Sequence, residues 1–156
     1  MKEQLGKETP GLIAKEDRLG REERSQSDAK RSFRRLKREG EARAPVSRFK
    51  PPQNSNEISV NRMDLVSMAT MVELGVRNAS SSGKLFWGWY ILTAGDIEEV
   101  GCSVKPSPSD DNPYHADIVI PVALDAEERR DEVIEYARDL AYHATFLPWG
   151  EWTKTV

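Results

Sequence analysis

The chain of 156 residues holds a single cysteine, Cys102, and two histidines. One cysteine excludes a disulfide within the chain and any zinc or iron–sulfur site built on clustered cysteines. No stretch approaches the roughly 20 consecutive apolar residues that a membrane-spanning helix needs. Residues 1–19 carry acidic side chains and lack the apolar segment of a secretory signal. We therefore expect a cytoplasmic protein that has no membrane partner and no cofactor.

Apolar residues are also scarce, at 38%, whereas charged residues reach 31%, so part of the chain is expected to lie outside the core. The charges are distributed unevenly. Residues 1–50 hold 15 Lys and Arg against 9 Asp and Glu, and residues 51–156 hold 8 against 17. A basic segment ahead of an acidic body is typical of a chain that contacts a polyanion or an acidic protein surface.

Residues 1–45 are predicted to form a basic, mostly disordered arm, because they hold too few apolar side chains to offset the entropy of ordering. A short helix over residues 29–39 would place four arginines on one face. Guanidinium groups at this spacing suit phosphates, because each donates two parallel hydrogen bonds and keeps its charge. The candidate nucleic-acid-binding residues are therefore Arg31, Arg34, Arg35 and Arg38. The alternative is a solvated basic tail without a ligand.

Residues 46–156 are predicted to form one compact α+β domain, with a small mixed or mainly antiparallel sheet packed by two to three helices. The strands are expected at residues 57–60, 85–92, 102–105 and 117–122. Three helices are expected: one capped by Asp64 and ended by Gly75, one from Thr93 to Gly101, and one over residues 126–144 that Asp125 and Glu128 begin.

The aromatic residues concentrate in two places. Residues 85–92 are apolar or aromatic except for Gly88, which indicates a bulge or a close backbone approach. Alternation along the strand predicts that Trp87 and Trp89 share a face. Residues 146–152 are too aromatic for a free tail and are expected to dock on the domain. Trp149 and Trp152 are thus candidates for covering the strand or for binding a protein partner, and a base-stacking platform is the alternative.

His115 is the main candidate for a catalytic residue. It follows a polar loop and begins a predicted strand, on which Asp117, two residues further along, would lie on the same face. Together with Arg48-Phe49 and residues 59–62 (SVNR), which include Ser59 and Arg62, it could form a pocket for a nucleotide or a nucleic-acid phosphate. Arg62 would bind the phosphate, Ser59 would contact a neighbouring oxygen, and His115 would act as acid or base. The simpler interpretations are a structural hydrogen bond for His115 and an ion pair for Arg62.

The remaining chemical inventory is thin. The only cluster of metal-ligating residue types is Asp110, Asp111, His115 and Asp117, and its spacing matches no established metal motif. The sequence also lacks a glycine-rich phosphate loop and a Gly-x-Ser-x-Gly nucleophile turn. We therefore predict no metal site and favour a non-catalytic role.

Three short motifs carry a resemblance: Arg48-Phe49-Lys50-Pro51, residues 57–62 (EISVNR) and residues 112–118 (NPYHADI). In these the chain resembles a loose group of small bacterial proteins of unknown function that share a Phe-x-Pro start, a Ser-Val strand and a Pro-x-His-Ala turn. The resemblance covers about residues 46–122. It implies a bacterial or phage origin and one domain from about residue 46, and it implies no activity.

Two hypotheses follow from the sequence. In the first, the chain is an accessory protein of a bacterial or phage system. Its acidic, aromatic-rich domain binds a protein partner, and its basic arm contacts nucleic acid or that partner. In the second, the chain is a small enzyme that acts on a nucleotide or nucleic-acid phosphate with His115, Arg62 and Ser59.

Overall fold

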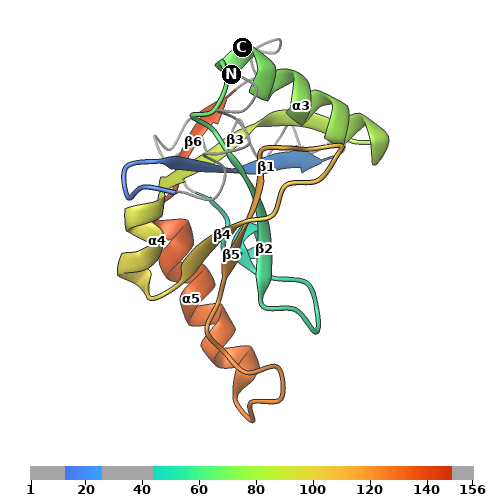
Figure 1. Ribbon diagram of the computed structural model, residues 1–156. Helices are drawn as coiled ribbons and strands as arrows, with labels where there is room; N and C mark the ends of the chain where they lie inside the picture. The colour runs from blue at the N-terminus through green and yellow to red at the C-terminus, as the bar shows by residue number, and fades with distance from the viewer. Residues whose placement is uncertain (1–12, 26–43, 149–156) are drawn as a thin grey trace, which may run out of the picture.

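The computed structural model describes residues 13–25 and 44–148, which form an α+β fold around one six-stranded sheet. Every pair of neighbouring strands is antiparallel, and the order across the sheet is β4-β5-β2-β1-β3-β6. The strands are β1 (Arg18–Ser25), β2 (Glu57–Arg62), β3 (Leu85–Thr93), β4 (Ser103–Pro106), β5 (His115–Val119) and β6 (Thr145–Pro148). The helices are η2 (Val46–Phe49), α3 (Met68–Ser81), α4 (Ala94–Val100) and α5 (Arg129–His143) (Figure 1).

The predicted α+β class is confirmed, and the predicted arm needs one correction. Arg18–Ser25, which the sequence assigned to the arm, forms β1 in the middle of the sheet, between β2 and β3. Its ladder with β3 runs from Arg18↔Thr93 to Ser25↔Leu85. Leu19 is the one large apolar residue of this strand, and it is fully buried. The other side chains of β1 are mostly charged, so the strand lacks the apolar alternation by which strands are predicted.

Helices cover both faces of the sheet, and each face has its own core (Figure 1). On one face α3 packs through Met71, Leu74 and Ala79 against Phe86 and Trp89. On the other face the core combines buried residues of α4 and α5 with strand residues and Phe49; its helical members are Ala94, Ile97, Val133, Ala137, Leu140 and Ala141. Because helices pack on both faces, the sheet is held from two sides. The candidate site lies where two strands of this sheet, β1 and β2, separate.

A bulge in β3 corrects the predicted placement of the tryptophans. The register with β1 shifts between Glu23 and Arg24, which leaves one extra residue in β3. Trp87 therefore packs in the core beside α5 and Trp89 in the core beneath α3, on opposite faces of the sheet. Both indoles are at most 1% exposed, so they offer no base-stacking surface. Gly88 has a φ of 145°, and a β-carbon there would lie 2.3 Å from the Leu147 carbonyl oxygen, which confirms the predicted close approach.

The short helix α4 follows its sequence signals. Thr93 and Asp96 form the predicted capping box, in which each side chain accepts a hydrogen bond from the other residue's backbone nitrogen. Gly101 ends the helix in the left-handed conformation, with a φ of 100°.

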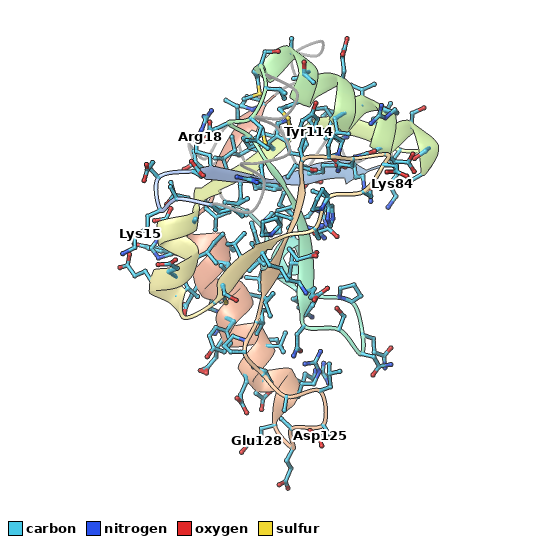
Figure 2. All side chains as sticks on the ribbon, viewed as in Figure 1. Lys15, Arg18, Lys84, Tyr114, Asp125 and Glu128 are labelled. Atoms are coloured by element: carbon cyan, nitrogen blue, oxygen red, sulfur yellow. The ribbon has the colours of Figure 1, made fainter. Side chains whose placement is uncertain are left out.

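The starts of the longer helices differ from the predictions. Ser67, not Asp64, caps α3, because Asp64 instead accepts hydrogen bonds from the Arg18 backbone and guanidinium at 2.7–2.9 Å. Gly75 lies inside α3, where its lack of a side chain leaves room for the Phe86 ring. The longest helix, α5, begins at Arg129 without a side-chain cap, so the predicted box of Asp125 and Glu128 does not form; both lie at the tip that leads into the helix (Figure 2).

The C-terminal aromatic segment docks on the sheet as far as the structure describes it. β6 pairs with β3, with Phe146 opposite Tyr90 and their ring centroids 5.1 Å apart. Trp149 and Trp152 lie outside the described residues. No helix of residues 13–25 and 44–148 combines the length and the apolar character that crossing a membrane requires.

Candidate functional site

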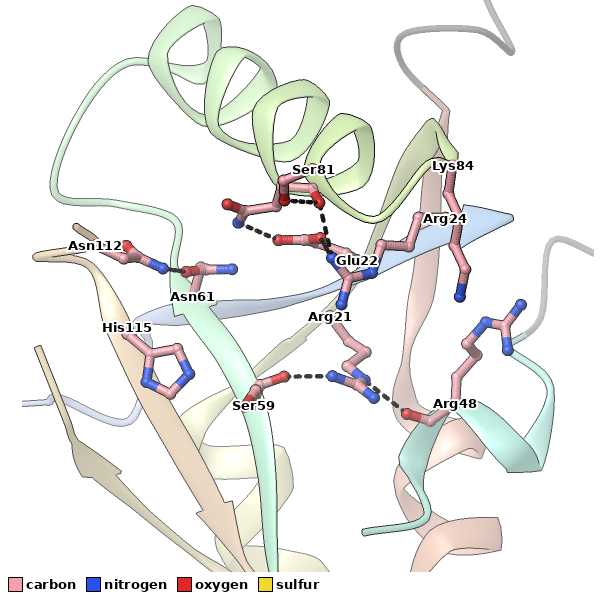
Figure 3. A pocket seen from close by; sticks show the side chains of 11 residues that line it. Arg21, Glu22, Arg24, Arg48, Ser59, Asn61, Ser81, Lys84, Asn112 and His115 are labelled. Atoms are coloured by element: carbon pink, nitrogen blue, oxygen red, sulfur yellow. Dashed lines mark hydrogen bonds and ion pairs between the residues drawn. The ribbon is translucent and has the colours of Figure 1, made fainter. Parts of the chain in front are cut away.

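A polar pocket lies where two neighbouring strands separate. β1 and β2 pair only at Leu19↔Arg62 and Gly20↔Asn61, although β1 continues beside β3 to Ser25 and β2 continues beside β5 back to Glu57. The resulting pocket has a volume of about 400 Å³ (Figure 3). The charged residues that line it are Arg21, Glu22, Arg24, Arg48 and Lys84, and the neutral or titratable polar ones are Ser59, Asn61, Asn78, Ser81, Asn112 and His115.

Arg21 bridges the gap between the two strands. Its Nε donates to the Arg48 carbonyl oxygen at 2.8 Å and its Nη1 to the Ser59 carbonyl oxygen at 2.9 Å (Figure 3). Burial lowers the pKa of Arg21, because it removes water from the cation; the neighbouring charges of Glu22 and Glu23 oppose this effect, and those of Arg24 and Arg48 add to it. Within residues 13–25 and 44–148 no carboxylate forms an ion pair with this guanidinium. Arg21 therefore presents a positive charge at the base of the pocket.

Arg48 is neutralised by Glu23. Its Nε and Nη2 donate to the two carboxylate oxygens of Glu23, both at 2.6 Å, and Glu23 is only 2% exposed. This carboxylate raises the pKa of Arg48. Burial and the same carboxylate, which is hydrogen-bonded to the Tyr90 hydroxyl, raise the pKa of Tyr90. The pair fixes η2 against β1 and shapes the wall of the pocket without adding net charge.

Glu22 is the acidic group of the pocket. One of its carboxylate oxygens, Oε2, accepts a hydrogen bond from Asn78 Nδ2 at 2.8 Å, and the other, Oε1, lies 3.5 Å from Arg24 Nη1. Burial raises the pKa of Glu22, although Asn78 and Arg24 partly oppose this effect. Arg24 also donates to the Asn78 carbonyl oxygen near the end of α3, at 3.1 Å. Glu22 thus anchors the C-terminal turn of α3 over the pocket.

His115 lines the pocket with one ring nitrogen already occupied. Its Nδ1 lies 2.7 Å from Ser107 Oγ and 3.2 Å from the Ser107 carbonyl oxygen. These contacts orient the ring and leave Nε2 for a ligand. Asn112 donates to Asn61 Oδ1 at 2.7 Å and holds the loop before β5 at the rim of the pocket.

The structure brings together two of the three predicted catalytic residues. Ser59 and His115 both line the pocket, on adjacent strands β2 and β5. Arg62 does not line it, because strand residues alternate and Arg62 lies on the side of β2 that carries Ile58 and Val60. The predicted trio therefore does not converge, and Arg21 provides the cation that Arg62 was expected to provide.

The pocket residues that were not predicted from the sequence include four charged ones: Arg21, Glu22 and Arg24 of β1, and Lys84 beside β3. The first three fell in the segment interpreted as a disordered arm. The sequence feature that marks them is the charged run REER after Leu-Gly. It indicates pocket residues only if the segment is known to be a strand.

The predicted nucleic-acid-binding residues Arg31, Arg34, Arg35 and Arg38 lie outside the described residues, as do Trp149 and Trp152. In the part of the chain that the structure describes, no group of three or more His, Cys, Asp or Glu side chains is placed to hold a metal ion.

Comparison of the chain with protein-family models, with curated proteins and with solved structures gave no match. The pocket itself is therefore the basis for proposing a function.

Proposed function

We propose that this chain is a nucleic-acid-binding protein whose pocket holds a phosphate group. The observation that carries the proposal is Arg21, a partly buried guanidinium whose hydrogen bonds within the described residues go to backbone carbonyls. A buried cation without a carboxylate partner is costly unless a ligand supplies the negative charge. Phosphate oxygens fit this role, because guanidinium and ammonium groups bind them through short, charge-assisted hydrogen bonds.

The charge distribution favours a strand of nucleic acid as the source of the phosphate. The three arginines of the pocket come from residues 1–50, which carry six more basic than acidic side chains, and Lys84 adds a fourth cation from the acidic residues 51–156. The stretch between Arg24 and Arg48 contains Arg31, Arg34, Arg35 and Arg38, four cations for further phosphates of the same strand. In this proposal the chain is an accessory factor, and Trp149 and Trp152 contact a protein partner.

A second candidate function rests on the position of His115. With Nδ1 held by Ser107, its Nε2 is available as an acid or base beside a bound phosphate, and Ser59 lines the same pocket. The chain would then be an enzyme that acts on a nucleotide or nucleic-acid phosphate. Release of phosphate or cleavage of an oligonucleotide by the wild type, abolished in His115→Gln, would favour this function over simple binding.

The binding function is tested by placing a carboxylate inside the pocket. Ser80 and Ser81 are both exposed and both line a groove on the outer face of α3, but only Ser81 also lines the pocket. Ser81→Glu and Ser80→Glu therefore change the same helix end by the same charge. Affinity for a short single-stranded oligonucleotide is measured by fluorescence anisotropy at several salt concentrations.

We expect Ser81→Glu to weaken binding about tenfold or more, because it repels a phosphate at contact distance, and Ser80→Glu to change it about twofold. For every phosphate that the Ser81→Glu variant no longer neutralises, the salt slope should also fall by roughly 0.7 for a single strand. Equal affinities of the two variants, or an affinity independent of salt, would contradict the proposal.

A further inference from the structure

The charges of the pocket do not all cancel. Arg48 is paired with Glu23, and Arg24 lies 3.5 Å from Glu22. Among residues 13–25 and 44–148, the two remaining cations, Arg21 and Lys84, have no carboxylate partner. The lining therefore has two positive charges in excess before His115 is counted. An internal phosphodiester supplies one negative charge, whereas a phosphate monoester supplies close to two at neutral pH.

The neutral part of the lining is composed of short polar side chains. Ser59, Asn61 and Asn112 line one wall, and Ser81 lines the side formed by the end of α3 (Figure 3). Asn78, also on α3, is a further lining residue. Among the described residues no Phe, Tyr or Trp lines the pocket, so it lacks the large aromatic rings on which bases usually stack. Its recognition elements are hydrogen-bond donors and acceptors, which suit phosphate oxygens and sugar hydroxyls.

The dimensions of the site agree with a ligand that ends there. A volume of about 400 Å³ is at the small end of the range for small-molecule pockets. Side chains of β1, β2, β5, α3 and η2 surround it, so the lining groups approach from several directions (Figure 3). A terminal phosphate has three oxygens free to accept hydrogen bonds from the lining groups. An internal phosphate has only two, because its other two oxygens are bonded to the continuing chain.

His115 provides a further donor for a terminal phosphate. Ser107 holds its Nδ1, so Nε2 is the ring nitrogen that remains for the pocket. In the tautomer that carries its proton on Nε2, this nitrogen donates a hydrogen bond to a phosphate oxygen.

Building on the proposed function, we infer that the pocket binds the terminal phosphate monoester of a nucleic-acid strand rather than an internal phosphodiester. Arg21 and Lys84 balance its two charges, and His115 Nε2 and the serine and asparagine side chains bind its oxygens. The chain then recognises strand ends that carry a phosphate, such as those left by cleavage or processing.

The test compares single-stranded oligonucleotides of one sequence that carry a 5′-phosphate, a 3′-phosphate or only hydroxyl ends, together with the matching mononucleotide. Affinities are measured at physiological ionic strength for the wild-type chain, Ser81→Glu and Ser80→Glu. We expect one of the phosphorylated strands to bind about tenfold tighter than the hydroxyl strand, because it gains charge-assisted hydrogen bonds. Ser81→Glu should abolish this gain and Ser80→Glu should retain it.

The outcomes separate the inference from the function on which it rests. Equal affinities for phosphorylated and hydroxyl strands, both weakened by Ser81→Glu, would overturn the monoester inference and leave phosphate binding in place. A mononucleotide that binds as tightly as the phosphorylated strand would support the monoester and overturn the preference for nucleic acid. Absence of binding to every probe would overturn both.

Discussion

Arg48 and Glu23 form a two-point ion pair that ties the short helix η2 to the central strand β1, with both N–O distances at 2.6 Å. Glu23 is buried on β1, whereas the side chain of Arg48 is one-third exposed at the rim of the pocket. The same carboxylate is hydrogen-bonded to the Tyr90 hydroxyl of β3. One acidic residue thus connects η2, β1 and β3 directly behind the pocket.

Replacing Arg48 should therefore destabilise the fold. Arg48→Ala leaves the Glu23 carboxylate buried without its cation, and we expect the free energy of unfolding to fall by about 3 kcal/mol. The measurement is urea denaturation followed by tryptophan fluorescence. Arg138→Ala, an exposed arginine on α5, is the control and should cost less than about 0.5 kcal/mol. A destabilisation at Arg48 no larger than at Arg138 would show that the ion pair does not support β1.

Gly88 is predicted to be the least replaceable glycine of the described residues. Gly88→Ala combines a φ of 145° with a β-carbon 2.3 Å from the Leu147 carbonyl oxygen. We expect the variant to be less stable by about 3 kcal/mol or more, since backbone strain and a clash with β6 add together. Gly83→Ala is the matched control, because its φ is also positive, at 70°, but no atom lies within 4 Å of its β-carbon. It should cost only about 1 kcal/mol. Equal destabilisation of the two variants by thermal denaturation would disprove the close approach of β6.

Glu22→Gln is predicted to stabilise the protein and to tighten phosphate binding. Burial raises the pKa of Glu22 in the folded state, so the ionised carboxylate costs stability above that pKa, and the cost disappears as the pH falls toward its ordinary value. At neutral pH the variant should melt roughly 2–4 °C higher than the wild type.

The difference in melting temperature should shrink with falling pH, because the wild-type carboxyl then becomes protonated. Affinity for a phosphorylated strand should rise about threefold, because one negative charge leaves the pocket. If the variant melted at a lower temperature at neutral pH, or bound the strand more weakly, the ionised Glu22 carboxylate would instead stabilise the fold or the bound state.

Cys102 is expected to be unreactive in the folded protein. Burial, with a smaller contribution from Asp139, raises its pKa to about 11, and the side chain is 6% exposed. Because the thiolate is the reactive form, a disulfide reagent at mildly alkaline pH should modify Cys102 at the rate of unfolding only. In denaturant the thiol should react within the mixing time. Fast reaction in native buffer would show that the segment between α4 and β4 opens readily.

The sequence predicts the fold where local signals and tertiary packing agree. Thr93, Asp96 and Gly101 determine α4 by backbone hydrogen bonding and a left-handed φ, both of which depend on near neighbours. β1 was missed because its charged side chains are explained by partners distant in sequence: Arg18 by Asp64, Glu23 by Arg48 and Tyr90, and Arg21 by the Ser59 carbonyl. No pattern within the strand reveals those partners.

The candidate site was predicted only in part, because it too depends on contacts between residues distant in sequence. The sequence placed Ser59 and His115 on two strands and suggested that they could converge. They line one pocket because β2 and β5 pair, and that pairing was not predicted. Arg62 was misplaced by one step of strand alternation. The shared face expected for Trp87 and Trp89 was wrong because Trp87 is the extra, unpaired residue of the bulge in β3, which interrupts the alternation. A shift of one residue reverses a side chain, and the composition of a strand does not reveal it.

Binding of a phosphate in the gap between β1 and β2 can be observed by NMR. A short oligonucleotide with a terminal phosphate is titrated into the full chain while backbone amide chemical shifts are followed. We expect the largest changes around Arg21, Ser59 and His115, which line the pocket, and none at Arg138 on α5. The largest changes on α5, or no changes around the pocket at saturating ligand, would contradict phosphate binding in this gap.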